Sequence, residues 1–142
     1  GIYRPSNPKK YKGDYRNIIY RSLWERKFMN YCDLNENILE WASEEFWVPY
    51  KDPTTNRVRR YFPDFFIKYK DKDGDIKRSV IEVKPLRETL EPKVTKGKSR
   101  KTLINESMTY IKNQAKWKAA REFCADRKLE FKIMTEKELG IR

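Results

Sequence analysis

The 142-residue chain contains no histidine and only two cysteines, and both shortages exclude classes of chemistry. Without histidine it cannot form a Ser/His or Cys/His nucleophile pair or a histidine-ligated zinc site. Cys32 and Cys124 are too few for a structural zinc site, and they fall in segments with helical spacing, so no disulfide framework is expected. Any chemistry in this chain must therefore use carboxylates, lysines, tyrosines and hard cations.

Long apolar runs are also absent, since the longest are triplets such as residues 65–67. A membrane-spanning helix needs about 20 consecutive apolar residues. We therefore expect a soluble protein with reduced thiols, in a cytoplasmic setting and without membrane contact.

Positive charge is what the chain has in excess. It contains 33 Lys plus Arg residues against 21 Asp plus Glu residues, which gives a formal net charge of +12. Its 4 Trp, 9 Tyr and 7 Phe residues distinguish it from a disordered basic tail, which lacks the apolar area needed to offset chain entropy. The charge favours a polyanionic partner, and we expect nucleic acid; the alternative is a merely solvated basic surface.

Two segments that are distant in the sequence concentrate this charge. Residues 1–17 mix cations with prolines and tyrosines and predict a flexible N-terminal arm, whereas residues 92–101 predict a mobile basic loop. We expect both to bind the DNA backbone, although a disordered terminus and a solvated linker are the competing interpretations. The predicted DNA-binding residues are Lys9, Lys10, Lys12, Lys93, Lys96, Lys98, Arg100 and Lys101.

Residues 18–142 predict a single α/β domain. Apolar residues at helical spacing indicate two helices, and runs rich in aromatic and apolar residues indicate strands. The predicted helices span residues 20–33 and 99–127, and the predicted strands span 38–41, 44–50, 58–70 with a break at Pro63, 76–84 and 129–134. We expect the strands up to residue 84 to form a meander within a central mixed sheet of four or five strands, flanked by helices. A capping box at Thr135 predicts a short terminal helix.

Asp64 is the residue whose placement is most unusual, because large apolar side chains flank it on both sides. A buried carboxylate without a partner costs several kcal/mol or takes up a proton. Further along the chain, Glu82 and Lys84 alternate with Ile81 and Val83. Because side chains alternate along a strand, Glu82 and Lys84 point to the same face.

The loop between the two strands decides whether Asp64 faces Glu82. A two-residue loop at 73–74 would direct the two carboxylates to opposite faces of the hairpin. A three-residue loop at 72–74, with Gly74 in the left-handed conformation, places them directly opposite each other, with side-chain roots about 5 Å apart. We predict this second register.

Two carboxylates this close repel each other and need either a proton or a cation between them. Hard oxygen ligands select Mg²⁺, and Mn²⁺ is expected to substitute for it. Lys84, beside the pair, can serve an attacking water or stabilise charge on a phosphate.

Pro63-Asp64 followed by Glu82-Val83-Lys84 resembles the PD-(D/E)xK motif of the restriction-endonuclease-like nucleases. Glu25 matches the acid that members of this superfamily often carry on the preceding helix. The superfamily resemblance covers about residues 18–135. The whole chain more closely resembles the head completion nucleases of T-even-like tailed bacteriophages, and more distantly the endonuclease subunit of heteromeric bacterial transposases.

The resemblance implies a restriction-endonuclease-like core and metal-dependent hydrolysis of phosphodiester bonds in double-stranded DNA. It also implies that Asp64, Glu82 and the Val83 carbonyl bind Mg²⁺, that Lys84 serves the attacking water, and that Glu25 contacts this metal or a second one. For the phage family it implies action in head completion after DNA packaging. The expected setting is the host cytoplasm or the virion, with portal or neck proteins as partners and no small-molecule cofactor besides the metal.

Several of these residues have other interpretations. Glu25 stands three residues after Ser22, which is the spacing of a capping box. Gln114 and Lys118 share a face of the long helix and are candidates for contact with a phosphate, but a plain polar helix face is the favoured interpretation. Asp71 opens a stretch that imitates a calcium-binding loop, which we reject because its sixth position is not glycine. The main rival function is a non-catalytic DNA-binding neck or connector protein on the same fold.

Overall fold

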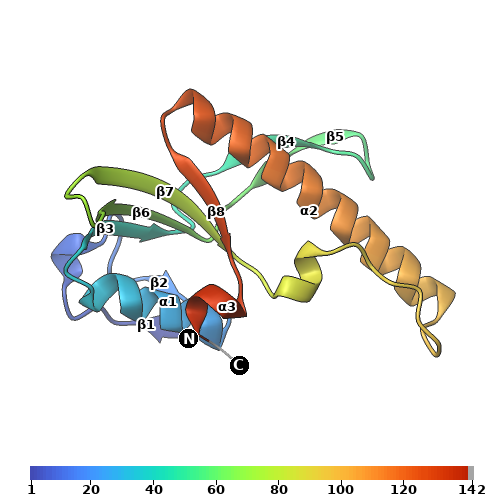
Figure 1. The fold of residues 1–142 in the computed structure, drawn as a ribbon, viewed down its shortest axis with the longest axis horizontal. Coiled ribbons are helices and arrows are strands. Elements are labelled where there is room, and N and C mark those ends of the chain that lie inside the picture. Colours follow the sequence, from blue (N-terminus) through green and yellow to red (C-terminus); the bar gives the residue numbers. More distant parts are fainter. Residues whose placement is uncertain (141–142) are drawn as a thin grey trace.

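The computed structural model describes residues 1–140 and has at its centre a four-stranded mixed sheet (Figure 1). The strand order is β3-β6-β7-β8, in which β8 runs parallel to β7 and the other neighbours are antiparallel. The strands are β3 (Ile38–Ser43), β6 (Phe65–Lys70), β7 (Ile76–Val83) and β8 (Glu130–Met134). The expectation of an α/β fold with a mixed four- to five-stranded sheet is confirmed.

Helices cover both faces of this sheet. Helix α1 (Leu23–Leu34) packs Phe28 and Met29 against Phe65 and Ile81 of the sheet. On the opposite face, α2 (Arg100–Asp126) buries Trp117 and its neighbours in a second cluster. The short helix α3 (Glu136–Leu139) carries the predicted capping box of Thr135, and single 3-10 turns lie at η1 (Pro8–Lys10) and η2 (Leu86–Thr89).

Strands β4 (Val48–Asp52) and β5 (Arg57–Tyr61) form a separate two-stranded ribbon, so the expectation of a continuous meander is wrong. The chain leaves the sheet after β3, runs through the ribbon and returns at β6, which pairs with β3. Packing explains the departure, because Val48, Tyr50 and Tyr61 are buried against α2 instead of extending the sheet.

The N-terminal segment differs from the mobile arm expected of residues 1–17. Strand β1 (Ile2–Tyr3) pairs with β2 (Ile18–Ile19), and Tyr3 and Tyr11 are buried against Trp41. The buried Asp33 carboxylate accepts hydrogen bonds from the backbone N–H groups of Ser6 (2.7 Å) and Asn7 (3.0 Å). The segment is docked because its tyrosines bury apolar area and because Asp33 accepts hydrogen bonds from its backbone N–H groups.

Helix α2 matches the predicted bounds to within one residue, but its apolar spacing does not mark its buried face. Ile104, Met108 and Ile111 are exposed, whereas Asn113, Trp117, Ala120 and Cys124 are buried. The first half of α2 extends past the sheet, beside the segment that carries η2 (Figure 1). Among the described residues, none of the helices is long and apolar enough to cross a bilayer.

Replacement of Asp33 by Ala should lower the free energy of unfolding by about 2–3 kcal/mol, because two backbone N–H groups lose a charged acceptor. Chemical denaturation measures this change, and limited proteolysis should show faster cleavage within the first 17 residues. Asp126→Ala, at an exposed site, is the control and should change stability by less than about 0.5 kcal/mol. Equal stability of the two variants would contradict the anchoring role of Asp33.

Candidate active site

The β6–β7 hairpin has the predicted register. Its pairs run from Phe65↔Ile81 to Lys70↔Ile76, and a three-residue loop over 72–74 follows, with Gly74 at φ 83°. Continuing this register by one residue brings Asp64 opposite Glu82. The predicted register and the positive φ of Gly74 are confirmed, and the charge of Glu82 raises the pKa of Asp64, as expected of two carboxylates on one face.

Hydrogen bonds from the protein hold both carboxylates. Asp64 Oδ2 accepts the backbone N–H of Val83 at 2.7 Å, and Glu82 Oε2 accepts the Tyr61 hydroxyl at 2.5 Å. Lys84 Nζ lies 3.8 Å from Glu82 Oε1. The two carboxylates therefore bring hard oxygen donors together, of the kind that Mg²⁺ and Mn²⁺ prefer.

The electrostatics of the pair favour a bound cation. Burial raises the pKa of Asp64 to about 8, repulsion from Glu82 adds to the rise, and the Val83 N–H opposes it. Burial also raises the pKa of Glu82, against the Tyr61 hydrogen bond and the charge of Lys84. Without a cation the pair therefore retains a proton at neutral pH, and the donor set fits a divalent metal that would replace it.

Lys116 of α2 belongs to this site, although the sequence analysis did not single it out. Its ammonium lies 5.8 Å from the ring centroids of both Tyr50 and Tyr61. Burial lowers the pKa of Lys116, and attraction to the Glu82 carboxylate is the largest effect in the other direction. No sequence signal distinguishes Lys116 from the other lysines of α2. Only the packing around Trp117 decides which lysine of the helix is turned towards the site.

Gln114 and Lys118 lie on α2 as expected, and neither forms a hydrogen bond or ion pair with the carboxylates among the described residues. Lys118 is exposed and lies two residues from Lys116, which is about 200° around the helix. Gln114 is half-buried and makes no side-chain hydrogen bond among residues 1–140. Their contact with a phosphate stays a prediction.

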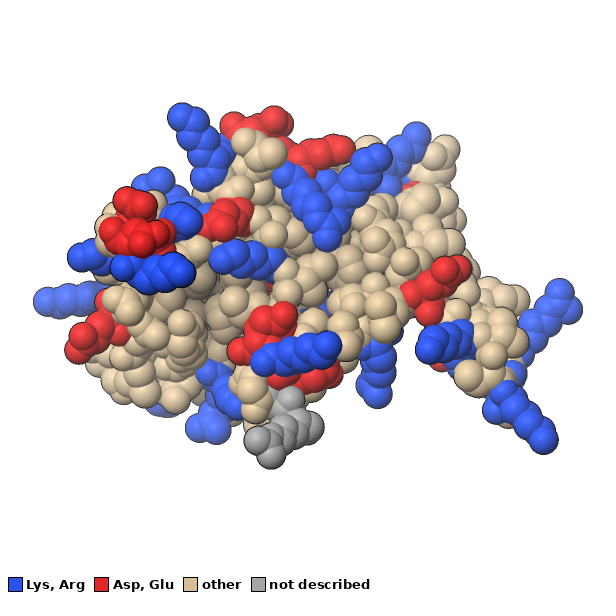
Figure 2. Space-filling model, in the orientation of Figure 1, with Lys and Arg blue, Asp and Glu red and all other residues tan. Residues whose placement is uncertain are grey.

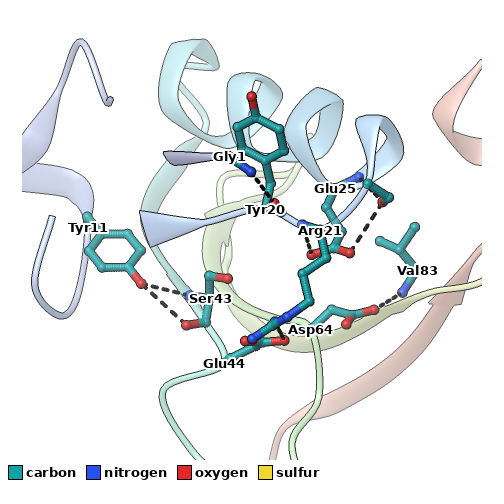
Figure 3. A network of polar contacts seen from close by, with 10 residues as sticks. Gly1, Tyr11, Tyr20, Arg21, Glu25, Ser43, Glu44, Asp64 and Val83 are labelled. Atoms are coloured by element: carbon teal, nitrogen blue, oxygen red, sulfur yellow. Dashed lines mark hydrogen bonds and ion pairs between the residues drawn. The ribbon is translucent and has the colours of Figure 1, made fainter. Parts of the chain in front are cut away.

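Glu25, in the first turn of α1, serves as part of a helix cap and also faces the site (Figure 3). Its N–H donates to Ser22 Oγ (3.1 Å), and its carboxylate accepts the Ser22 hydroxyl (3.3 Å) and the Arg21 N–H (3.5 Å). The negative charge of Glu25 contributes to the raised pKa of Asp64. Ser22 therefore caps the helix, but the reciprocal bond of a full capping box, from the Ser22 backbone N–H to Glu25, is not among the contacts of the described residues. The charge of Glu25 lies near the carboxylate pair.

Arg21 and Glu44 are two further residues at this site that the sequence analysis missed. They form an ion pair, and the Glu44 N–H donates to the backbone carbonyl of Asp64 at 3.1 Å (Figure 3). Glu44 has φ 54°, a left-handed conformation that costs a residue with a Cβ about 1–2 kcal/mol. This strained turn at the end of β3 fixes the backbone from which the Asp64 side chain projects.

The two basic segments are exposed but partly engaged within the protein. Lys10 donates to the backbone carbonyls of Asp33 (3.0 Å) and Asn35 (2.8 Å), and Lys12 pairs with Glu40 at 3.4 Å. In the loop, Lys98 binds Glu106 at 2.8 Å and the carbonyl of Lys93. The exposed members are Lys9, Lys12, Lys93, Lys96, Arg100 and Lys101. Figure 2 shows cationic side chains scattered over the visible face among acidic ones, so surface charge alone does not mark the site.

The acidic cluster Asp71, Asp73 and Asp75 has a structural explanation. Asp71 Oδ1 accepts the N–H groups of Asp73 and Asp75, both at 2.9 Å, and its other oxygen lies 3.3 Å from Lys77. These contacts close the β6–β7 loop and hold the register on which the carboxylate pair depends.

The raised pKa of Asp64 predicts how the metal-free protein responds to pH. Its folded pKa exceeds its unfolded value of 3.8, so the unfolded state loses the proton first and stability falls as pH rises from about 4 to about 8. No histidine titrates in this range. In EDTA, Asp64→Asn should therefore gain stability relative to the parent protein as pH increases. Parallel melting curves from pH 5 to pH 8 would contradict the buried pair.

Two comparisons with known proteins agree with this arrangement. Residues 35–136 match the sequence pattern of the TnsA-like endonuclease N-terminal domain. The chain is also 37% identical over 139 residues to the head completion nuclease of Enterobacteria phage T4, an alignment that covers 96% of this chain and 90% of the phage protein. With the mixed sheet and the paired carboxylates, these matches establish that the chain belongs to the TnsA-like endonuclease family, within the restriction-endonuclease-like nucleases.

Proposed function

We propose that this protein is a Mg²⁺-dependent DNA endonuclease of the PD-(D/E)xK type that acts in phage head completion after DNA packaging. The observation that carries the proposal is the juxtaposition of Asp64 and Glu82 beside Lys84. The similarity to a phage head completion nuclease supports the biological setting. A protein that only bound DNA would gain nothing from two repelling carboxylates.

Asp64, Glu82 and the backbone carbonyl of Val83 would hold the metal, with Glu25 near enough to influence it through its charge. The chemistry that bound Mg²⁺ supplies is polarisation of the phosphate and acidification of water. The Tyr61 hydroxyl fixes the orientation of the Glu82 carboxylate by its 2.5 Å hydrogen bond.

Two lysines provide the positive charge that the reaction needs. Lys84 Nζ lies 3.8 Å from Glu82 Oε1 and would orient the attacking water. Lys116 comes from helix α2, whereas Lys84 follows strand β7. Lys116 would face the phosphate of the DNA as negative charge develops on it. Its partial burial strengthens this interaction, because less water screens the charge.

Double-stranded DNA is the proposed substrate, and Mn²⁺ should substitute for Mg²⁺. Portal or neck proteins are the proposed protein partners, and the host cytoplasm or the virion is the proposed location. The competing function is a non-catalytic neck or connector protein that keeps the nuclease fold and only holds a DNA end.

Nicking of supercoiled plasmid with and without Mg²⁺ or Mn²⁺ tests the proposal. The parent protein should cleave only with metal, and Asp64→Asn should lower the rate by at least about 100-fold, because a ligand charge is lost while the shape is kept. DNA affinity without metal should stay equal or rise, since repulsion from phosphate is relieved. Asp126→Asn, at the far end of α2, is the control. Equal cleavage by Asp64→Asn, or none by the parent protein, would favour the connector function.

Lys116→Met should reduce the cleavage rate by about 10- to 100-fold with little change in melting temperature, because the aliphatic chain still packs on the tyrosine rings. The loss should fall mainly on kcat if Lys116 contacts the phosphate in the transition state. Lys116→Arg should restore part of the rate. A change confined to KM would assign Lys116 to substrate binding alone.

A further inference from the structure

The line along which the β4–β5 ribbon packs on α2, from Asp52 to Tyr61, leads to the carboxylate pair; we call this line the seam. Opposite residues of an antiparallel ribbon share a face, so Val48/Tyr61, Tyr50/Arg59 and Asp52/Arg57 all face the same side. Val48, Tyr50 and Tyr61 of this face pack against α2, which identifies it as the seam face. Its base is Tyr61, whose hydroxyl donates to Glu82.

Cations follow this seam from the tip of the ribbon to the site. At the tip, the fully buried Asp52 carboxylate lies 3.2 Å from Arg59 Nε and 3.9 Å from Lys112 Nζ. One helical turn further along α2, Lys116 lies against the rings of Tyr50 and Tyr61. Beyond it come Glu82 and its neighbour Lys84. The row thus runs Arg57, Arg59, Lys112, Lys116 and Lys84.

These cations outnumber the charge that could neutralise them. Asp52 carries one negative charge between two cations, and the Arg59 and Lys112 side chains are still 48% and 39% exposed. Arg57 is exposed and forms no ion pair among the described residues. A row with net positive charge and accessible head groups fits a polyanion.

The dimensions of the row match a short stretch of nucleic acid strand. From Asp52 to Val48 the ribbon rises about 14 Å, at about 3.4 Å per residue. Lys112 and Lys116 are about 6 Å apart along the helix axis. Each strand of duplex DNA carries one phosphate per about 3.4 Å of helix axis, and the phosphates are farther apart along the strand itself, so the seam is long enough for about two to four nucleotides.

We propose that the seam between the β4–β5 ribbon and α2 is the track that holds the DNA strand leading to the scissile phosphate, through Arg57, Arg59, Lys112 and Lys116. The inference rests on the proposed function, because it takes the carboxylate pair as the end of the track. It makes the seam, and not residues 92–101 or the N-terminal segment, the principal contact with the backbone on one side of the cut. Asp52 is a positioning residue that orders the cations at the tip.

The test is the salt dependence of binding to a 20-base-pair duplex, measured by fluorescence anisotropy in EDTA. The double variant Arg57→Gln/Lys112→Gln should lower the magnitude of the slope of log affinity against log salt by about 0.9 for each cation removed. Arg59 remains to pair with Asp52, so the fold should be retained. If the double variant melts at a lower temperature, the single variant Arg57→Gln replaces it in the test. Arg57 forms no ion pair among the described residues, so this variant should keep the fold and still lower the magnitude of the slope by about 0.9.

The matched control is Lys51→Gln/Arg60→Gln, which removes the same charges from the opposite face of the same ribbon, where Lys51 and Arg60 are exposed. Its slope should stay close to that of the parent protein. Equal loss in both double variants, or no loss in the seam variant, would overturn the inference. Because these measurements contain no metal, they are independent of cleavage: a seam that binds DNA without plasmid nicking would overturn only the proposed function.

Discussion

Repulsion between the Asp64 and Glu82 carboxylates is the constraint around which the rest of the structure is arranged. The hairpin register forces the two side chains onto one face, and burial makes two negative charges there expensive. The surrounding groups reduce that cost in part: the Val83 N–H and the Tyr61 hydroxyl each donate one hydrogen bond, and two lysines contribute positive charge. A divalent cation would neutralise the negative charge that remains on the pair.

Elements from the whole chain keep this costly arrangement in place. The strained Glu44 holds the Asp64 backbone from the β3 side, and the N-terminal segment is docked on the core that supports β3. After Val83, the Lys84 N–H donates to the Met134 carbonyl at 2.9 Å, and the Leu86 N–H donates to Glu136 at 2.8 Å. Strand β8 and helix α3 therefore fix the chain on the exit side of the site, so a short motif depends on contacts between distant segments.

The sequence predicted the hairpin and its acids because their signals are local. Gly74 and side-chain alternation narrow the hairpin to two registers with no knowledge of the rest of the fold, and the structure has the register with the three-residue loop. The ribbon, the docked N-terminal segment and Lys116 depend on tertiary packing, which the local pattern does not contain. The same limit applies to α2, whose apolar spacing predicted its length while its buried face is set by Trp117. Glu44 could have been found only from its backbone conformation.

The most direct test of the carboxylate pair as a metal site is anomalous diffraction from crystals soaked in millimolar Mn²⁺. We expect one strong peak between Asp64, Glu82 and the Val83 carbonyl, with ligand distances of about 2.1 Å. Crystals of Asp64→Asn, treated in the same way, should lose it. A peak only at the acidic loop of Asp71, Asp73 and Asp75, or none at the pair while the site is open to solvent, would contradict the assignment.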